Sequence, residues 1–451
     1  MTSGGDGPVN WKTLRLTGWG RSSWAKVAAC RPERTRETIA AIVAAEKGGI
    51  IAYGGGRSYG DAALNDGGRT ILTARLDRLL EFDEATGRIV CEPGVSFYDL
   101  LYTFAPRGFL VPVSPGTGFA TIGGAVANDV HGKNHDRLGS FGDHVEWFDL
   151  ALPSGDVVRV SEESHPRLFA ATIGGVGLTG VLLSICFRMI RTSSTAVQVT
   201  EKRIKNLDAF LEELEESRNR CTYSVGWIDA LAGGNRLGRG ILETAEPASE
   251  GPTVTRRNQW ALPFDFPSWV LNPVTVSSFN ALYYRRVPSS GRERIIAVNR
   301  FFYPLDSVRD WNRLYGKRGL YQFQCVLPDA HSREGLRRLL EETVASRAAS
   351  FLAVLKTLGG EGRGYLSFPM RGYTLAFDFP RRRVVGELIA RLEHITLDYG
   401  GRVYLAKDAR LSAEGFAAMY PKLHAFRQVL AEVDPEGRMS SDLARRLRIR
   451  G

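Results

Sequence analysis

The distribution of apolar and polar residues changes near residue 195 of the chain. Before that point, short apolar runs lead into glycine-rich stretches, as at residues 50–56. After it, apolar residues recur at helical spacing over residues 207–214 and alternate with polar residues over residues 319–327. These patterns predict a helix and a strand, and the change of pattern predicts a domain boundary near residue 195.

Three later segments complete this pattern. Residues 400–407 predict a turn followed by a strand, and residues 413–433 predict a helix that ends at Asp434 and Pro435. Residues 260–284 hold seven aromatic residues and three prolines. Neither the strand period nor the helix period fits them, which predicts a long aromatic loop. Helices and strands are therefore mixed, without the regular alternation of a doubly wound sheet.

Composition and charge limit the classes of partner. A chain of 451 residues with 43 % hydrophobic content is long enough for two domains. The net charge of +10 favours a partner or substrate that carries negative charge. Nucleic acid is disfavoured, because basic clusters such as residues 381–383 lack the interleaved aromatic residues of a base-stacking surface.

Cysteine usage and hydropathy narrow the setting further. Five cysteines stand far apart without a C-x-x-C pair, which favours free buried thiols over a disulfide framework or a zinc site. Residues 1–12 lack the pattern of a signal peptide. No apolar run reaches the ~18 residues of a spanning helix. We expect a soluble or peripheral protein.

The first candidate binding motif is the run Tyr53-Gly54-Gly55-Gly56-Arg57-Ser58-Tyr59-Gly60-Asp61, which follows an apolar strand pattern. Consecutive glycines let backbone N–H groups converge on a pyrophosphate, and arginine and serine add side-chain donors. A plain glycine-rich turn explains the same run equally well, because short glycine motifs recur by chance.

A second motif strengthens the cofactor interpretation. Residues 114–118 and 121–132 combine small residues with hydroxyl and amide groups, which suits close packing against a flat ring system. A third motif contains a formal G-x-G-x-x-G match at Gly175, Gly177 and Gly180. We do not interpret it as a Rossmann fingerprint, because residues 181–187 predict a strand where that fingerprint requires a helix.

Together these segments resemble the FAD-binding domain of the vanillyl-alcohol oxidase superfamily. Within it, the chain is similar to the family of decaprenylphosphoryl-β-D-ribose 2′-oxidases, from about residue 8 to the C-terminus. The matching segments are residues 53–61, 131–135, 139–142, 321–324, 406–410 and 440–446.

The resemblance implies an α+β fold of two domains. It places a PCMH-type FAD-binding domain at residues 8–194 and an antiparallel-sheet substrate domain at residues 195–401, with 260–284 as a mobile aromatic loop. Residues 402–451 would return to the FAD domain.

The implied cofactor is non-covalent FAD. Many superfamily members attach the flavin to a histidine in the first glycine loop, whereas this loop carries Arg57, Ser58 and Tyr59. The residues that the resemblance places against the cofactor are Tyr53, Gly54, Gly55, Gly56, Arg57, Ser58, Tyr59, Gly60, Asp61, Gly116, Thr117, Thr121, Ile122, Gly123, Gly124, Asn128, Asp129, Val130, His131, Leu182 and Tyr404.

The implied catalytic residues are Lys407 and His131. Lys407 matches the essential lysine of the family, as either a base or an electrostatic group, although a solvated surface lysine would be the usual interpretation without the match. His131 and His135 have the spacing of metal ligands, but no third ligand is evident and no metal site is predicted. The implied substrate-binding residues are Lys133, Tyr59, Trp227, Gln322, Gln324, Lys356, Thr374 and Ala376.

Two of these positions depart from the mycobacterial members of the family. Those members carry asparagine where Thr374 stands and cysteine where Ala376 stands. Hydride transfer does not need the cysteine, so the reaction stays plausible. Its absence removes the thiol that nitroaromatic covalent inhibitors trap.

The implied reaction is FAD-dependent oxidation at C2 of a polyprenylphosphoryl-β-D-ribose, the first half of its epimerisation to the arabinose donor for cell-wall arabinan. A separate NAD(P)H-dependent keto-reductase would complete it. The resemblance also implies work at the cell envelope. The composition of the aromatic loop, with Arg285 and Arg286 after it, suits peripheral contact with a polyprenyl tail or the plasma membrane, and a packed insertion explains it equally well. The alternatives are another alditol or carbohydrate oxidase of the superfamily, or a non-catalytic binder of lipid-phosphate sugars.

Overall fold

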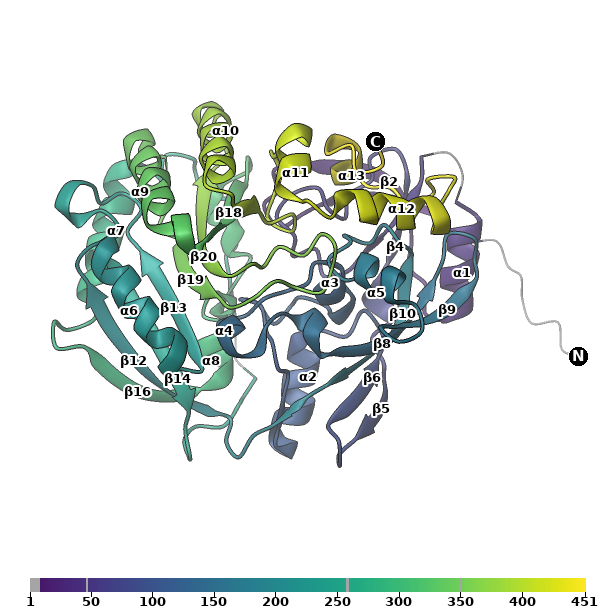
Figure 1. Cartoon of the computed structure of the whole chain (residues 1–451), viewed down its shortest axis with the longest axis horizontal. Helices are drawn as coiled ribbons and strands as arrows, with labels where there is room; N and C mark the ends of the chain where they lie inside the picture. The colour runs from purple at the N-terminus through teal and green to yellow at the C-terminus, as the bar shows by residue number, and fades with distance from the viewer. Residues whose placement is uncertain (1–8, 46–47, 257–258, 349) are drawn as a thin grey trace, which may run out of the picture.

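The computed structural model describes residues 9–45, 48–256, 259–348 and 350–451. Residue 8, where the predicted FAD-binding domain begins, lies outside the described residues. The strands of residues 196–403 lie to the left in Figure 1 and those of residues 12–188 to the right. Mainly antiparallel sheets and separate layers of helices make this the α+β fold that the sequence predicts. The domain boundary near residue 195 stays a prediction.

Two sheets form the first part of the chain. The smaller one has the order β1-β2-β4-β3 and pairs β3 in parallel with β4, so that the apolar run at residues 50–53 is the strand that was predicted. The larger one is antiparallel, and its central strand β10 is buried except at its last residue. The bounds are β1 Lys12–Thr17, β2 Trp24–Cys30, β3 Ile50–Tyr53, β4 Arg69–Leu72, β5 Leu79–Asp83, β6 Arg88–Cys91, β8 Val145–Ala151, β9 Val157–Ser161 and β10 Val181–Arg188.

Short helices cover these two sheets and connect their strands. Residues 181–187 lie in β10, so the prediction of a strand after the third glycine motif is confirmed. The bounds are α1 Thr35–Val43, α2 Phe97–Phe104, α3 Ile122–Ala127, α4 His135–Leu138 and α5 Pro166–Thr172, with a two-stranded pair of β7 Phe109–Leu110 and β11 Ile190–Arg191.

An eight-stranded sheet dominates the second part. Its order is β16-β12-β14-β13-β19-β20-β18-β21, and its neighbouring strands run antiparallel. Helices α6, α9 and α10 pack on one face, and the other face turns toward the first two sheets. The bounds are β12 Ala196–Ile204, β13 Tyr223–Ile228, β14 Gly240–Pro247, β16 Arg292–Ala297, β18 Leu320–Pro328, β19 Ala353–Leu358, β20 Gly372–Pro380, β21 Arg402–Val403, α6 Leu207–Arg220, α8 Val298–Phe302, α9 Asp329–Ser346 and α10 Arg383–Asp398.

The helix at residues 207–214 and the strand at residues 319–327 are thus confirmed as parts of α6 and β18. Two other predictions are wrong. Residues 413–433 form two helices, α11 Ala413–Met419 and α12 Leu423–Val433, because Pro421 lacks the N–H that an unbroken helix would need. The strand predicted over residues 402–407 is only Arg402–Val403, and Lys407 lies in the turn that follows.

The prediction of a loop over residues 260–284 is also wrong in its second half. Residues 260–261 form β15 (Trp260–Ala261), which pairs with β17 Val308–Arg309. Residues 273–285 form the helix α7 Pro273–Arg285. Asn272 caps this helix by accepting from the N–H groups of Val274 and Thr275, and Pro273 occupies its first position, where a missing N–H costs nothing.

The C-terminal segment returns to the first two sheets. The N–H of Ile50 donates to the carbonyl of Arg438 at 2.7 Å, and α13 Asp442–Arg446 ends with an arginine that binds Asp61. All five cysteines are free. Among the residues described, no helix combines the length and the apolarity needed to cross a membrane.

Candidate active site

A cavity of about 460 Å³ lies between the eight-stranded sheet and the glycine-rich segments. It brings together side chains from residues that are far apart in sequence, from Gly18 to Lys407. The predicted residues that line it are Tyr53, Gly54, Gly55, Gly56, Arg57, Ser58, Tyr59, Gly60, Gly116, Thr117, Thr121, Gly123, Gly124, Asn128, Val130, His131, Lys133, Leu182, Trp227, Gln322, Gln324, Lys356, Thr374, Ala376, Tyr404 and Lys407.

The first glycine segment packs against the second motif. A Cβ atom on Gly54 would lie 2.5 Å from the hydroxyl oxygen of Thr121, so the close approach requires glycine. Gly56 has a φ of +64°, which glycine adopts without strain. The second motif is partly a helix, α3, whose first turn is capped by the Thr121 side chain and contains Gly123 and Gly124. The sequence does not predict this helix, since six residues are too few to show a period.

Three predicted cofactor residues do not line the cavity. Asp61 is 6 % exposed and forms an ion pair with Arg446, which ties the C-terminal helix to the glycine segment. Asp129 is fully buried and accepts from the Gly142 N–H and the Ser367 hydroxyl. Ile122 lies in the hydrophobic core. These three residues lie within or beside the predicted motifs in sequence, but their side chains contact other protein groups and not the cavity.

Polar residues of three neighbouring strands face the cavity beside His131. The Lys356 Nζ atom on β19 lies 3.3 Å from His131 Nδ1, and Gln324 on β18 lies 3.1 Å from His131 Nε2. The Gln324 amide also donates to the Thr374 hydroxyl at 3.1 Å, on β20. Gln322 and Gln324 share one face of β18, as their alternation with Phe323 predicts. Both ring nitrogens of His131 are therefore engaged by protein groups.

The electrostatics of this cluster follow from burial. Burial lowers the pKa of His131 well below its usual value, and Lys356, His135 and Lys407 lower it further. Burial also lowers the pKa of Lys356 to about 7, helped by the like charges of Lys133 and Lys407. His131 is thus neutral at pH 7, whereas Lys356 is poised between its two states.

Lys407 reaches the same cluster from the turn after β21. The carbonyl of Ala406 accepts from the Tyr59 N–H at 2.9 Å, which fixes this turn against the first glycine segment. The Lys407 Nζ atom lies 4.1 Å from the centre of the Tyr59 ring. Burial lowers the pKa of Lys407 to about 8, although Asp378 raises it.

The ammonium group of Lys133 is bound by Phe301. Its Nζ atom donates to the Phe301 carbonyl at 2.5 Å and lies 3.9 Å from the centre of the Phe301 ring. Burial lowers its pKa to about 8. Lys133 lines the cavity, but its ammonium group already has two partners in the protein.

At the end of the cavity lined by glycines, two buried polar atoms lack a hydrogen-bond partner among the described residues. They are the Nε atom of Arg57 and the Oδ1 atom of Asn128. The Arg57 guanidinium lies between the rings of Trp19 and Phe119, at 4.3 and 4.7 Å from their centres. Buried polar atoms without partners are costly, so a polar ligand that reaches both fits this end of the cavity.

Comparisons with known proteins agree with this geometry. A family model described as an FAD binding domain matches residues 27–161, and one described as D-arabinono-1,4-lactone oxidase matches residues 377–447. The decaprenylphosphoryl-β-D-ribose oxidase of Mycolicibacterium smegmatis is 36 % identical over 97 % of this chain and 98 % of its own length. The chain belongs to the decaprenylphosphoryl-β-D-ribose oxidase family.

A more distant relative also matches along almost the whole chain. The alditol oxidase of a Streptomyces species is 24 % identical over 96 % of this chain and 98 % of its own length. The present member of the decaprenylphosphoryl-β-D-ribose oxidase family is an FAD-dependent oxidoreductase with a vanillyl-alcohol-oxidase-like α+β fold. The partnerless Arg57 and Asn128 atoms and the glycine surfaces fit an FAD molecule in the cavity.

Sequence reasoning missed two carboxylates in this family member. Asp306 lines the cavity, and Asp378 is fully buried against the cavity residue Gln322. Asp378 on β20 stands opposite Gln322 in the strand pairing and accepts its amide N–H, and burial raises the pKa of Asp378 to about 7. Asp306 accepts from the Thr117 hydroxyl and the Gly118 N–H. Asp378 alternates with Ala376 and Thr374 along one strand, and that alternation was the available signal. Nothing local in the sequence marks Asp306.

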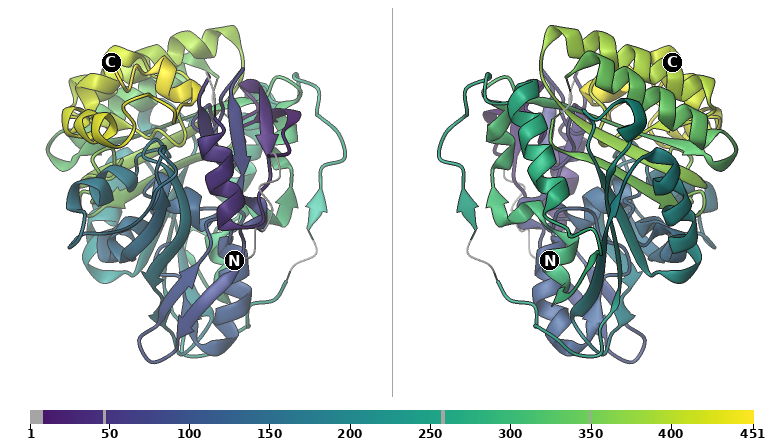
Figure 2. Two further views of the ribbon diagram at one scale, coloured as in Figure 1. Left: turned by 90° about the vertical axis from the view of Figure 1, so that its right-hand side faces the viewer. Right: turned by 90° about the vertical axis from the view of Figure 1, so that its left-hand side faces the viewer.

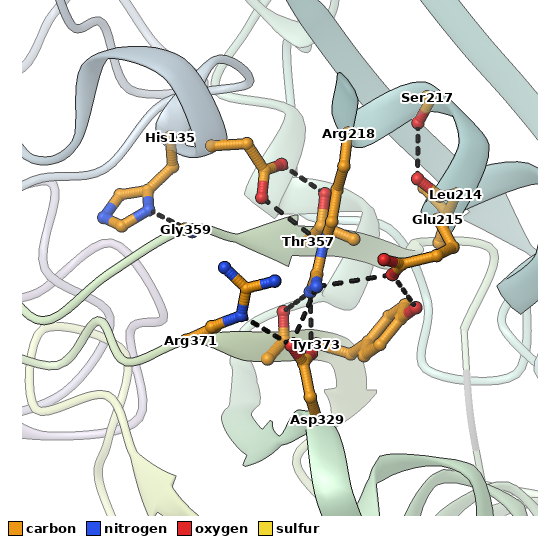
Figure 3. A network of polar contacts seen from close by, with 12 residues as sticks. His135, Leu214, Glu215, Ser217, Arg218, Asp329, Thr357, Gly359, Arg371 and Tyr373 are labelled. Atoms are coloured by element: carbon orange, nitrogen blue, oxygen red, sulfur yellow. Dashed lines mark hydrogen bonds and ion pairs between the residues drawn. The ribbon is translucent and has the colours of Figure 1, made fainter. Parts of the chain in front are cut away.

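A polar cluster behind the site fixes the strands that carry these side chains. Figure 3 shows Arg218 of α6 between Asp329 and Glu215. Its guanidinium also lies 3.5 Å from Asp136, which accepts from Thr357, the neighbour of Lys356 on β19. The Arg218 side chain is only 6 % exposed. This cluster therefore ties helix α6 and strand β19 to the segment that carries His131.

Proposed function

We propose that this protein oxidises the C2 hydroxyl of a polyprenylphosphoryl-β-D-ribose to the 2-keto sugar. The observation that carries the proposal is the combination of an FAD cavity with the partly buried Lys356 and Lys407, whose pKa values are lowered. Burial disfavours the charged form of Lys356, and an anionic phosphate beside it would favour that form again. The name of the Mycolicibacterium smegmatis relative supports the ribose substrate.

In this mechanism the protein positions the sugar and holds its proton. FAD, bound non-covalently, supplies the hydride acceptor for the hydrogen on C2. Neutral Lys407 takes the hydroxyl proton as the C2 carbonyl forms. A lysine with a pKa of about 8 is neutral in about a tenth of molecules at pH 7, enough for a general base. His131 orients Gln324 and Lys356, since both its ring nitrogens are engaged.

Gln322 and Gln324 bind the sugar hydroxyls, and the apolar wall leads the prenyl chain outward. Trp227 and Tyr283 line the cavity with ring centres 4.7 Å apart, and Leu352 and Val354 continue the wall. Alanine at position 376 leaves no thiol there. Nitroaromatic inhibitors that trap a cysteine should therefore bind only reversibly, and a covalent adduct in the intact mass would contradict this.

We also propose where the reaction belongs. A separate NAD(P)H-dependent reductase would reduce the 2-keto product to the arabinose form, which serves cell-wall arabinan synthesis. The protein would work at the cell envelope, in peripheral contact with the plasma membrane through residues 260–284. Trp260, Trp269 and Leu282 support this contact, with exposed fractions of 83 %, 71 % and 71 %.

Anaerobic mixing with a short-prenyl phosphoryl ribose tests the proposal. The yellow FAD-loaded protein should bleach with this substrate, and Lys407→Ala should keep its colour but bleach at least ~100-fold more slowly, because general-base catalysis is lost. Lys422→Ala, at an exposed lysine, is the matched control. Bleaching with unphosphorylated alditols alone would instead favour an alditol oxidase, the activity named in the Streptomyces relative.

A further inference from the structure

Three arginines surround a second, smaller pocket of about 100 Å³ on the surface. Arg318 follows the short helix Trp311–Tyr315, and Arg381 and Arg382 connect β20 to α10. Ser268 and Leu271, from the segment between β15 and α7, complete the wall. None of these residues lines the FAD cavity.

The positive charge of this pocket is not neutralised within the part of the chain that the structure describes. Arg382 donates to the carbonyls of Ser268 and Leu271, and Arg381 donates to the Tyr321 hydroxyl at 3.1 Å. Arg318 is exposed. No carboxylate of a described residue forms an ion pair with any of the three. An anion is the missing complement, because guanidinium groups bind phosphate through paired N–H donors.

Apolar side chains project from the segment beside the pocket. Phe264 and Trp269 have exposed fractions of 59 % and 71 %, and Trp260 at β15 is 83 % exposed. Arg313 holds the backbone of this segment by donating to the carbonyls of Leu262 and Pro263, both at 2.9 Å. In Figure 2, β15 and the chain that follows it run along the outside of the molecule. The aromatic rings are thus held outward by a fixed backbone.

The same surface adjoins the active cavity. Within the helix Trp311–Tyr315, Trp311 lines the FAD cavity, whereas Leu314 and Tyr315 line the arginine pocket. The rings of Trp311 and Tyr315 lie 6.2 Å apart. A surface that holds this pocket against a membrane would therefore hold the cavity close to that membrane.

We propose that the arginine pocket binds the phosphate of an anionic phospholipid headgroup while Trp260, Phe264 and Trp269 enter the interfacial layer. The proposal rests on the membrane contact proposed above and adds its site and its lipid class. Free phosphate shares the headgroup chemistry, but only a lipid surface also covers the exposed rings. Aromatic rings favour this layer, and each basic residue at an anionic surface strengthens binding by ~5-fold.

Co-sedimentation of the FAD-loaded full chain with vesicles tests the site. One set of vesicles contains phosphatidylcholine alone, and the other includes phosphatidylglycerol. The variants are Arg318→Ser with Arg381→Ser for the pocket, and Phe264→Ser with Trp269→Ser for the rings. Arg34→Ser with Arg36→Ser, two exposed arginines near the start of α1, is the matched control.

The protein should bind the anionic vesicles and scarcely the neutral ones. The pocket variant should bind anionic vesicles ~20-fold more weakly, the ring variant should also bind more weakly, and the control should match the parent protein. Equal binding to both vesicles, or normal binding by the pocket or ring variant, would overturn the proposal. So would complete displacement from vesicles by millimolar inorganic phosphate at constant ionic strength, which would identify free phosphate as the ligand.

Bleaching by a short, water-soluble prenyl substrate without vesicles should be the same in all these proteins. The vesicle result therefore tests the membrane site alone. A failure of the oxidation itself would appear in the parent protein as well, and the two failures are distinguishable.

Discussion

At the scale of single residues, the proposed contact of Lys356 with the substrate phosphate predicts that binding depends on pH. Burial holds its pKa at about 7, and a bound phosphate would favour the protonated form. The affinity for a non-reactive phosphorylated analogue should therefore be highest below pH 7 and fall as the pH rises through that value. Calorimetric titration from pH 6 to pH 9 measures this change.

Replacing Lys356 separates binding from chemistry. Lys356→Met should raise KM ~10- to 100-fold, the loss of a charged hydrogen bond, and should abolish the pH dependence of analogue affinity. Lys356→Arg, which stays charged, should keep tight binding to higher pH. A pH-dependent affinity that survives in Lys356→Met would assign the titration to another group.

Replacing Asp378 tests whether neutral Lys407 is the general base. The negative charge of Asp378 raises the pKa of Lys407, against the larger lowering by burial. If neutral Lys407 is the base, kcat/KM should rise with pH through about 8, and Asp378→Asn should move that rise to lower pH. His131, Lys356 and Tyr59 also face Lys407, but the substitution leaves them unchanged.

The control for this variant is another buried carboxylate. Asp129→Asn changes a side chain that is equally buried but bonds to Ser367 and the Gly142 N–H. A loss of packing alone would reduce activity in both variants and leave the pH profile in place. A profile that falls with rising pH in the parent protein would instead make protonated Lys407 the active form.

At the scale of elements, Arg218 joins α6, α9 and β20 to the segment that carries His131. It binds Asp329 at 2.8 Å and the Gly372 carbonyl at 2.9 Å, close to Asp136. Arg218→Met should lower the free energy of unfolding by ~1.5–3 kcal/mol, because the charged hydrogen bonds of the buried guanidinium to Asp329 and to the Gly372 carbonyl are lost. Chemical denaturation with saturating FAD measures the loss.

Arg220→Met on the same helix is the matched control. Arg220 pairs with Glu216, and its side chain is 66 % exposed. Such a surface pair is worth less than ~1 kcal/mol, so this variant should unfold close to the parent protein. Equal losses in the two variants would show that Arg218 acts only through helix α6.

The element scale also shows where local patterns succeed. β3 and β10 are predicted by continuous apolar runs, and β18 and α6 by the spacing of their apolar residues. α3 and α7 are not predicted, since α3 has only six residues and α7 buries only Val276 and Asn280. A helix without a buried apolar stripe has no period to detect. For α7, the only sequence feature that indicates a helix is the N-cap residue Asn272 followed by Pro273.

At the scale of the whole molecule, the cavity joins both parts of the chain. Its walls come from the glycine segments and from β18, β19 and β20. Bound FAD should therefore stabilise the folded chain, by ~2.7 kcal/mol at a hundredfold excess over Kd. The unfolding temperature of FAD-stripped protein should rise with added FAD.

Riboflavin is the control ligand. It carries the ring but not the pyrophosphate or the adenosine. It should raise the unfolding temperature less than FAD does at equal concentration, because Arg57 and the glycine segment at residues 54–56 would lose a partner. Equal shifts with both ligands would place the binding energy on the ring end alone.

By itself, the sequence determined the glycine-rich segments, the main strands and the residue types that line the cavity. These depend on short-range sterics and on the alternation of apolar residues, which a single sequence displays. Tertiary structure alone decided which of those side chains meet. It buried Asp61, Asp129 and Ile122 in the framework and paired Lys133 with Phe301. It also placed Asp306 at the cavity and Asp378 against Gln322.

The physical reason is the distance along the chain between partners. Lys407 meets Tyr59, and Lys356 meets His131, across hundreds of residues. No local pattern records which way a side chain points when its neighbours come from elsewhere in the sequence. The pKa values that set the proposed chemistry arise from burial among those neighbours, so they exist only once the two parts of the chain have packed together.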